Sequence, residues 1–217
     1  MADTEGRTNV PGLFATGRAR TYAPTTYLNG SSLCMTAVTG SITGKVAGEY
    51  SASQNTSDID LTEVKNLKRA LFSPLNRVGI PPKQILKEVQ KIVFPAEVGM
   101  LKNEENLKKA LARIEEIQNV LVPKMCAPDP HYLMKLVEVK GITFLTELFL
   151  RASIMRKETR GGHFREDYPK RDDKNWLGWI HVSCKGEERT LRKVPIPVDQ
   201  YPIKPTRFYT DNFNFPI

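Results

Sequence analysis

The residues best suited to chemistry stand in one charged run, Glu158–Trp176 (ETRGGHFREDYPKRDDKNW). Arginine and aspartate are interleaved in this run, and a guanidinium can pair with a carboxylate through two parallel hydrogen bonds. Such pairs would order a turn, so the run is predicted to be a docking loop and not a catalytic one. A solvated charged turn is the plain alternative for a loop of this composition.

Motifs for other chemistries fail on their spacing. Gly40–Lys45 (GSITGK) is one residue short of a phosphate-binding loop, and Val46 stands where that motif needs a hydroxyl. The sequence has no GxGxxG run and no nucleophile elbow. Its cysteines form no CxxC pair; they are Cys34, Cys126 and Cys184. We therefore predict no catalytic residue and no metal ligand in this chain.

The charge balance narrows the class of partner. The 217 residues carry a formal net charge of +8, from 32 Lys and Arg against 24 Asp and Glu. The basic residues alternate with acids on helix-like segments and no basic run carries interleaved aromatics, which indicates a solvated surface and no nucleic-acid partner. No segment reaches membrane-spanning length and the N-terminus lacks the apolar core of a signal peptide. We expect a cytoplasmic protein that does not insert into a membrane.

The secondary structure predicted for the first part of the chain differs from that predicted after the boundary near residue 57. Val10–Gly17 (VPGLFATG) is typical of a short apolar strand. From Ser32 to about Tyr50, small residues recur at helical spacing, as Ala37, Gly40, Gly44 and Gly48. Such a helix can approach either a strand or a flat ligand closely. The polar run 51–58 then marks a domain boundary.

Four helices with one-sided apolar stripes are predicted between residues 58 and 161. Asp58 or Asp60 would cap the first, Pro81-Pro82 would start the second and Asn103 the third, and the fourth would begin at His131. Their predicted inward residues are Val64, Leu67 and Leu71; Ile85, Val89 and Ile92; Leu107, Leu111, Ile114, Ile117 and Leu121; and Leu133, Val137, Phe144, Leu148, Ala152 and Met155. Because each stripe is one-sided, the helices need one another, and a bundle is the economical fold.

Residues 162–217 read as an extension of this bundle. The charged loop is followed by two predicted strands, which flank a turn at Lys185-Gly186. The tail from Pro195 is rich in proline and aromatic residues, and we expect it to lie extended over a surface.

Two stretches together resemble one protein family. The run from 158 to 176 is similar to the pattern E-S-R-G-x-H-x-R-x-D-x-P-x-R-D-D-x-N-W of the flavoproteins that include fumarate reductase, succinate dehydrogenase, L-aspartate oxidase and adenylylsulfate reductase. The matching residues are Glu158, Arg160, Gly161, His163, Arg165, Pro169, Arg171, Asp172, Asp173, Asn175 and Trp176. The stretch NVPGLFATG, followed by NGSSL and the small-residue helix, resembles the last FAD-contacting segment of the same family. The resemblance covers nearly the whole chain.

The resemblance implies a mainly α fold in three parts. Residues 1–57 would be the C-terminal end of an FAD-binding α/β domain, 58–161 the helical bundle domain and 162–217 a C-terminal extension. It also implies that FAD is contacted by Gly17, Arg18, Ser32 and Leu33. The N-terminus of the helix would face the pyrimidine edge of the flavin and stabilise negative charge that develops on reduction.

The function implied by the resemblance is that of one part of an FAD-dependent oxidoreductase. The family's dinucleotide motif and capping domain precede this region, so FAD is expected only together with a missing N-terminal flavoprotein portion or chain. An iron–sulfur subunit is a further candidate partner. The alternative is a non-catalytic helical interaction module that has kept the family scaffold.

Two departures from the family bear on this choice. Arg18 stands where the family usually has a glutamate for the ribityl hydroxyls of FAD. Tyr27 stands where an arginine of a His-Gly-Ala-Asn-Arg-like run helps to bind the substrate carboxylate. Both departures favour the alternative module and predict poor reduction of fumarate, whereas the NGSSL turn and the small-residue helix favour the flavin.

Overall fold

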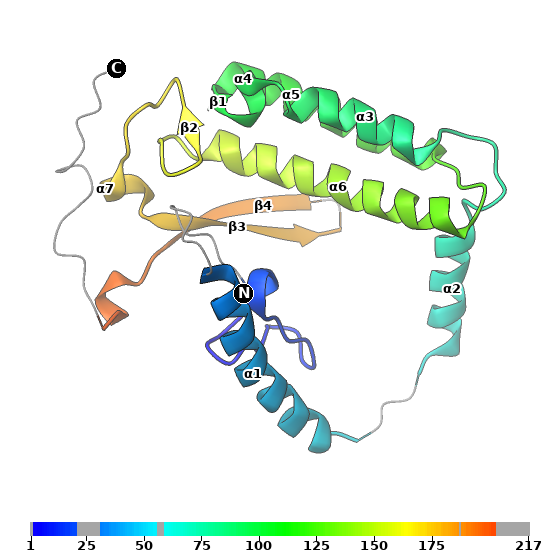
Figure 1. Cartoon of the computed structure of the whole chain (residues 1–217), viewed down its shortest axis with the longest axis horizontal. Coiled ribbons are helices and arrows are strands. Elements are labelled where there is room, and N and C mark those ends of the chain that lie inside the picture. The colour runs from blue at the N-terminus through cyan, green and yellow to red at the C-terminus, as the bar shows by residue number, and fades with distance from the viewer. Residues whose placement is uncertain (1, 21–30, 56–58, 187, 203–217) are drawn as a thin grey trace. The chain divides into compact units, whose positions relative to one another are not determined.

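The computed structural model describes residues 2–20, 31–55, 59–186 and 188–202. The chain divides into two compact units, Met1–Lys65 and Asn66–Ile217. Helices dominate the described residues, which confirms the mainly α prediction (Figure 1). The finer division into three parts at residues 57 and 161 stays a prediction.

The first unit is built on one long helix, α1 (Ser31–Ala52), preceded by the short 3-10 helix η1 (Gly17–Arg20). The predicted helix from Ser32 to about Tyr50 is thereby confirmed. Residues 2–16 lie in turns against α1, and the ring of Phe14 meets that of Tyr50 edge to face, with 5.6 Å between centroids. Nothing lies within 4 Å of the Cβ positions that Gly44 and Gly48 lack, so this part of the small-residue stripe is open.

The strand expected over residues 10–17 is wrong. Pro11-Gly12 turns the chain back on itself instead, because Leu13 N donates to Val10 O at 3.1 Å. Thr8 N then donates to Leu13 O at 3.2 Å, which closes a small loop. An apolar run becomes a strand only beside another strand, and the described residues offer it none beyond isolated bridges.

The second unit contains a bundle of three long helices, α3 (Pro82–Val93), α5 (Glu104–Glu116) and α6 (Pro130–Met155) (Figure 1). Their starts follow local rules. Pro82 occupies the first turn of α3, and Asn103 Oδ1 accepts from Asn106 N at 2.9 Å to cap α5. Short elements complete the helical part: α4 (Ala96–Gly99), a π-helical turn η2 (Ile117–Leu121) and the 3-10 turn η3 (Val122–Lys124). The buried core cluster consists of Ile85, Val89, Val98, Leu107, Ala110, Ile114, Ile117, Met125, Leu136, Val139 and Leu150.

The expected fourth member of the bundle, α2 (Leu61–Phe72), buries none of its residues. Asp60 caps it as predicted, because Asp60 Oδ1 accepts from Thr62 N at 2.8 Å. Its predicted inward residues are nevertheless exposed: Val64, Leu67 and Leu71. The prediction that these three pack in the bundle is wrong, since an apolar stripe shows that a face needs a partner and not which partner it has.

The predicted register of α6 is wrong in part. The buried face carries Leu133, Leu136, Val139, Thr143, Glu147, Leu150 and Ser153. Val137, predicted to be inward, is exposed, while Phe144, Leu148, Ala152 and Met155 are only partly buried. The more apolar face is thus not the one that packs against α3 and α5. Two polar residues of the buried face make hydrogen bonds there: Thr143 Oγ1 donates to Val139 O at 2.7 Å, and Glu147 Oε1 accepts from Arg151 Nε at 2.7 Å. The other carboxylate oxygen, Glu147 Oε2, is buried without a hydrogen-bond partner among the described residues.

Two small sheets complete the second unit. The predicted hairpin is confirmed: β3 (Gly178–Lys185) pairs antiparallel with β4 (Glu188–Pro195), and Gly186 takes the left-handed conformation at the turn. The hairpin lies along α6 (Figure 1). The two-residue strands β1 (Leu101–Lys102) and β2 (Phe164–Arg165) pair in parallel. The short helices α7 (Asp173–Trp176) and η4 (Val198–Gln200) flank the hairpin in sequence. None of the described helices is both long and apolar enough to cross a membrane.

Candidate functional site

The predicted FAD contacts lie where η1 meets the first turns of α1. Gly17 N donates to Thr39 Oγ1 at 3.0 Å, and Thr39 Oγ1 donates in turn to Met35 O at 2.6 Å. Gly17 has φ of 56°, and a Cβ there would lie 3.1 Å from Thr36 Oγ1. Only glycine suits both the left-handed backbone and the close approach, so Gly17 holds η1 directly on the helix.

Three of the four predicted contacts are brought together at this end of α1. Arg18 Nε donates to Ser32 Oγ at 3.2 Å, beside Gly17. Leu33 instead projects outward and is 79% exposed. The arginine adds positive charge to a helix N-terminus that is itself partly positive, so this end favours an anion or an electron-rich edge. The other residues of the turn and loop, Tyr27 among them, lie outside the described residues.

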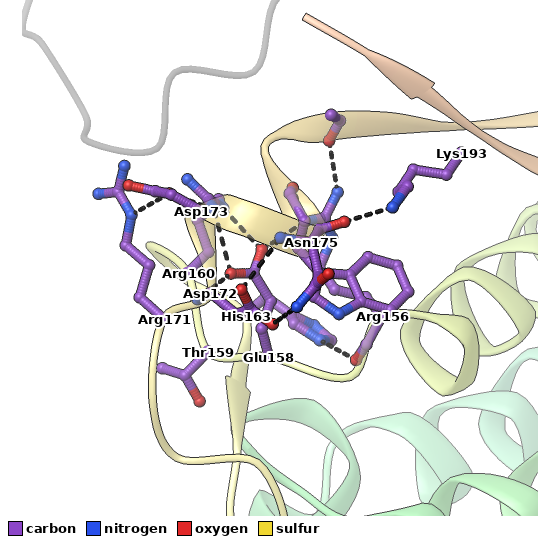
Figure 2. A network of polar contacts seen from close by, with 12 residues as sticks. Arg156, Glu158, Thr159, Arg160, His163, Arg171, Asp172, Asp173, Asn175 and Lys193 are labelled. Atoms are coloured by element: carbon purple, nitrogen blue, oxygen red, sulfur yellow. Dashed lines mark hydrogen bonds and ion pairs between the residues drawn. The ribbon is translucent and has the colours of Figure 1, made fainter. Parts of the chain in front are cut away.

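In the second unit the charged run forms a network around one buried carboxylate, that of Glu158 (Figure 2). Its oxygens accept from Arg156 Nη1 at 2.6 Å and from Arg160 Nε and Nη2 at 2.7 and 3.0 Å. A fourth donor is Asp172 N at 2.8 Å. The carboxylate has no exposed surface, so these donors replace its water.

Asp173 extends the network toward α7. Its Oδ1 accepts from Arg160 Nη2 at 2.6 Å and from Arg171 Nε at 2.7 Å. Burial opposes the charged form of Asp173, but the hydrogen bonds from the two arginines outweigh it and hold the pKa of this carboxyl below its ordinary value. Asp172 caps the same short helix through Asn175 N at 3.0 Å. The aspartates of the run therefore order a turn, as the sequence predicted.

Arg165 joins the ends of two bundle helices. Its Nη1 donates to Ser153 O at 2.6 Å and to Arg156 O at 3.0 Å, which satisfies carbonyls at the C-terminus of α6. Its Nε and Nη2 pair with the carboxylate of Asp167 at 2.7 Å each. Asp167 Oδ2 then accepts from Glu104 N at 2.9 Å at the start of α5. The fully buried guanidinium thus fixes α6 against α5.

His163 lies inside this region as a neutral ring. Burial lowers its pKa from 6.5 to about 4, and the positive charges of Lys102, Arg156 and Arg165 act in the same direction. A hydrogen bond to the backbone of Arg156, with Nε2 3.4 Å from its carbonyl oxygen, opposes the shift only in part. The histidine is not set up as a general base near neutral pH, because no nucleophile contacts it among the described residues.

The network links the end of α6 to the elements that follow it. Arg156 also donates to Trp176 O at 3.1 Å and to Gly178 O at 2.7 Å, so it ties the end of α6 to the start of the hairpin. The indole of Trp176 lies near two cations: Arg156 Cζ is 5.6 Å and Lys193 Nζ 5.4 Å from its ring centroid. Sequence reasoning missed Arg156, which lies two residues before the charged run begins at Glu158. No group of three or more potential metal ligands occurs among the residues described.

Comparisons with known proteins point to one family. The family described as fumarate reductase flavoprotein C-term matches residues 87–208. An uncharacterized FAD-dependent oxidoreductase of Methanocaldococcus jannaschii is 30% identical over 199 residues, which cover 89% of this chain and 35% of the relative. The fumarate reductase flavoprotein subunit of Helicobacter pylori strain 26695 is 27% identical over 201 residues, covering 86% of this chain and 28% of that subunit.

Solved structures agree with the sequence relatives. A structure of adenosine-5-phosphosulfate reductase in complex with sulfite is similar with a TM-score of 0.64 and 27% identity, over 74% of this chain and 29% of that one. A quinol-fumarate reductase with menaquinol molecules shares the fold with a TM-score of 0.79 at 21% identity, over 93% of this chain and 37% of that one. This chain therefore spans about a third of the length of the relatives it matches.

Proposed function

Because the chain belongs to the fumarate reductase flavoprotein family, in the C-terminal portion of that family, we propose that it forms one part of an FAD-dependent oxidoreductase. The observation that carries the proposal is the family match over residues 87–208. The contacts of Gly17 and Ser32 at the start of α1 support it, while Arg18 departs from the family's usual glutamate. The comparisons give no support to the alternative of a non-catalytic module.

The residues present fit one edge of a flavin. Because Gly17 has no side chain, η1 can lie close against α1 at this turn. Arg18 and the helix N-terminus supply positive charge there, and Ser32 and Leu33 would offer backbone N–H groups. The flavin would accept and pass on electrons, and these groups would stabilise the negative charge of its reduced pyrimidine edge.

The proposed FAD site is completed by another part of the enzyme. The chain spans 35% of the M. jannaschii relative and has no GxGxxG motif to hold the pyrophosphate. We infer that an N-terminal flavoprotein portion or chain supplies it, and that an iron–sulfur subunit is a second candidate partner.

The test joins this chain to the part of the M. jannaschii relative that precedes the matched region, which we call the joined protein. Ser32→Pro removes one backbone N–H in the first turn of α1, where proline is compatible with a helix. Ser32→Ala is the control, because it removes only the hydroxyl. We expect Ser32→Pro to weaken FAD binding or shift the flavin potential more than Ser32→Ala does. Equal affinity and potential in the two variants would contradict the placement of this turn at the flavin.

A further inference from the structure

Helix α6 carries a second apolar face, opposite the one that packs against α3 and α5. Apolar or small residues recur on it at spacings of three and four: Met134, Val137, Gly141, Leu145 and Leu148. Met134 is 56% and Leu145 63% exposed, and nothing lies within 4 Å of the Cβ position that Gly141 lacks. We call these five residues the outer stripe. A helix that is apolar on two opposite faces is typical of one that is covered on both.

Within the second unit, the hairpin covers only one end of the outer stripe. The hairpin reaches α6 beside its second half, where the guanidinium of Arg189 lies 5.3 Å from the ring centroid of Phe144. Leu148 is partly buried in this region. Toward the N-terminus of α6, from Leu145 back to Met134, the stripe stays open.

The open part of the stripe has little net charge. Lys135 and Glu138, which flank it, pair with each other at 3.0 Å. This sets the stripe apart from the chain as a whole, whose formal net charge is +8. A face of this kind does not suit nucleic acid or an anionic membrane surface, because both need unpaired cations. It suits an apolar, uncharged protein surface that can approach closely at Gly141.

The first unit, taken by itself, also has an uncovered apolar helix face. On α1 the exposed apolar residues Met35, Val38 and Ile42 recur at spacings of three and four and share one face, whereas Leu33 is exposed on another side of the helix. Contiguous apolar patches of this kind mark interaction surfaces on soluble domains.

We propose that the outer stripe of α6 is the docking surface for the N-terminal flavoprotein portion, an inference that rests on the function proposed above. Relatives carry about two thirds of their length outside the region matched here, since the chain spans 35% and 28% of two of them. A folded body of that size can cover the outer stripe. A small ligand cannot cover a face of this length, and a second copy of this chain, which could pair its own stripe with this one, is the occupant that the oligomeric state below distinguishes.

The experiment places one substitution, Leu145→Asp, in two contexts: this chain alone and the joined protein. The control is Lys140→Asp, which introduces the same side chain at an exposed position of α6 outside the stripe. Thermal unfolding is measured in all four variants and both parents, and flavin absorbance is recorded for each joined protein. Analytical ultracentrifugation of the chain alone gives its oligomeric state.

We expect Leu145→Asp to change the melting temperature of the chain alone by less than about 2 °C, because Leu145 is exposed there. In the joined protein it should lower the melting temperature by about 5 °C or more, because a carboxylate would be buried without a partner. Lys140→Asp should have little effect in either context.

Failure of this inference is distinguishable from failure of the proposed function. If the unsubstituted joined protein folds without FAD, the proposed function is wrong. If the joined protein holds FAD but Leu145→Asp lowers its melting temperature no more than Lys140→Asp does, the proposed docking surface is wrong. A chain that is dimeric alone, and that Leu145→Asp makes monomeric, would assign the stripe to a second copy and overturn the inference.

Discussion

Replacing Glu158 by glutamine keeps the shape of the side chain and removes the charge that holds the loop network together. In the native chain this carboxylate is fully buried and accepts from two arginines and from one backbone N–H. The amide of Glu158→Gln would offer only one acceptor oxygen, and its NH₂ group would face donors. Arg156 would lose its carboxylate partner, whereas Arg160 would keep Asp173.

The expected cost follows from burial. Removing one partner from a buried ion pair destabilises a protein by about 3–5 kcal/mol, because a desolvated charge is left behind. Domains of ordinary size have about 5–15 kcal/mol of stability in total. Glu158→Gln should therefore remove a large part of the stability of the second unit, and it should loosen the hairpin that Arg156 ties to α6.

Urea unfolding followed by tryptophan fluorescence measures this effect, since Trp176 lies against Arg156. Glu105→Gln is the matched control: Glu105 also accepts from a cation, Lys109 Nζ, at 2.6 Å, but its side chain is 76% exposed. We expect the control to leave the unfolding midpoint almost unchanged, since exposed ion pairs contribute little. Equal losses of unfolding free energy in the two variants would refute the claim that the ion pairs of Glu158 stabilise the fold because they are buried.

Three further predictions concern pH, packing and substrate. The pKa of His163 is about 4 in the folded chain against an ordinary 6.5, so the unfolded chain takes up the proton first and stability should fall as pH drops from 6.5 to 4. His163→Gln should flatten this decline in urea titrations at several pH values. Leu150→Ala should cost about 2–5 kcal/mol of unfolding free energy and Leu148→Ala clearly less, because only Leu150 is fully buried; equal costs would refute the observed register of α6. The joined protein should reduce fumarate on the order of a thousandfold less efficiently than a relative with arginine at the position of Tyr27, and rapid anaerobic oxidation of its reduced flavin by fumarate would contradict this.

Features set by local chemistry could be predicted from the sequence. The caps at Asp60 and Asn103, the proline start of α3 and the turn at Gly186 each depend on a few neighbouring residues, and all are confirmed. The ordered turn in the charged run could also be predicted, because its arginines and aspartates lie close together in sequence.

Features set by distant partners could not be predicted. The predicted inward face of α6 differs in part from the buried one because the helix has two apolar faces, and only contact with α3 and α5 selects one of them. The apolar stripe of α2 indicates a face that packs against a partner, but no residue of this helix is buried among the described residues. Asp167 accepts from Glu104 N at the start of α5, 63 residues away in sequence, and no periodic pattern links these two positions. The four predicted FAD contacts stay predictions, although the structure places Arg18 against Ser32.

The flavin content of the purified protein tests the central claim most directly. FAD absorbance per polypeptide would be measured for this chain alone and for the joined protein, prepared in the same way. We predict no bound flavin in the chain alone and about one FAD per polypeptide in the joined protein, because the two parts each supply one side of the site. Stoichiometric FAD in the chain alone, or a folded joined protein without flavin, would contradict the account.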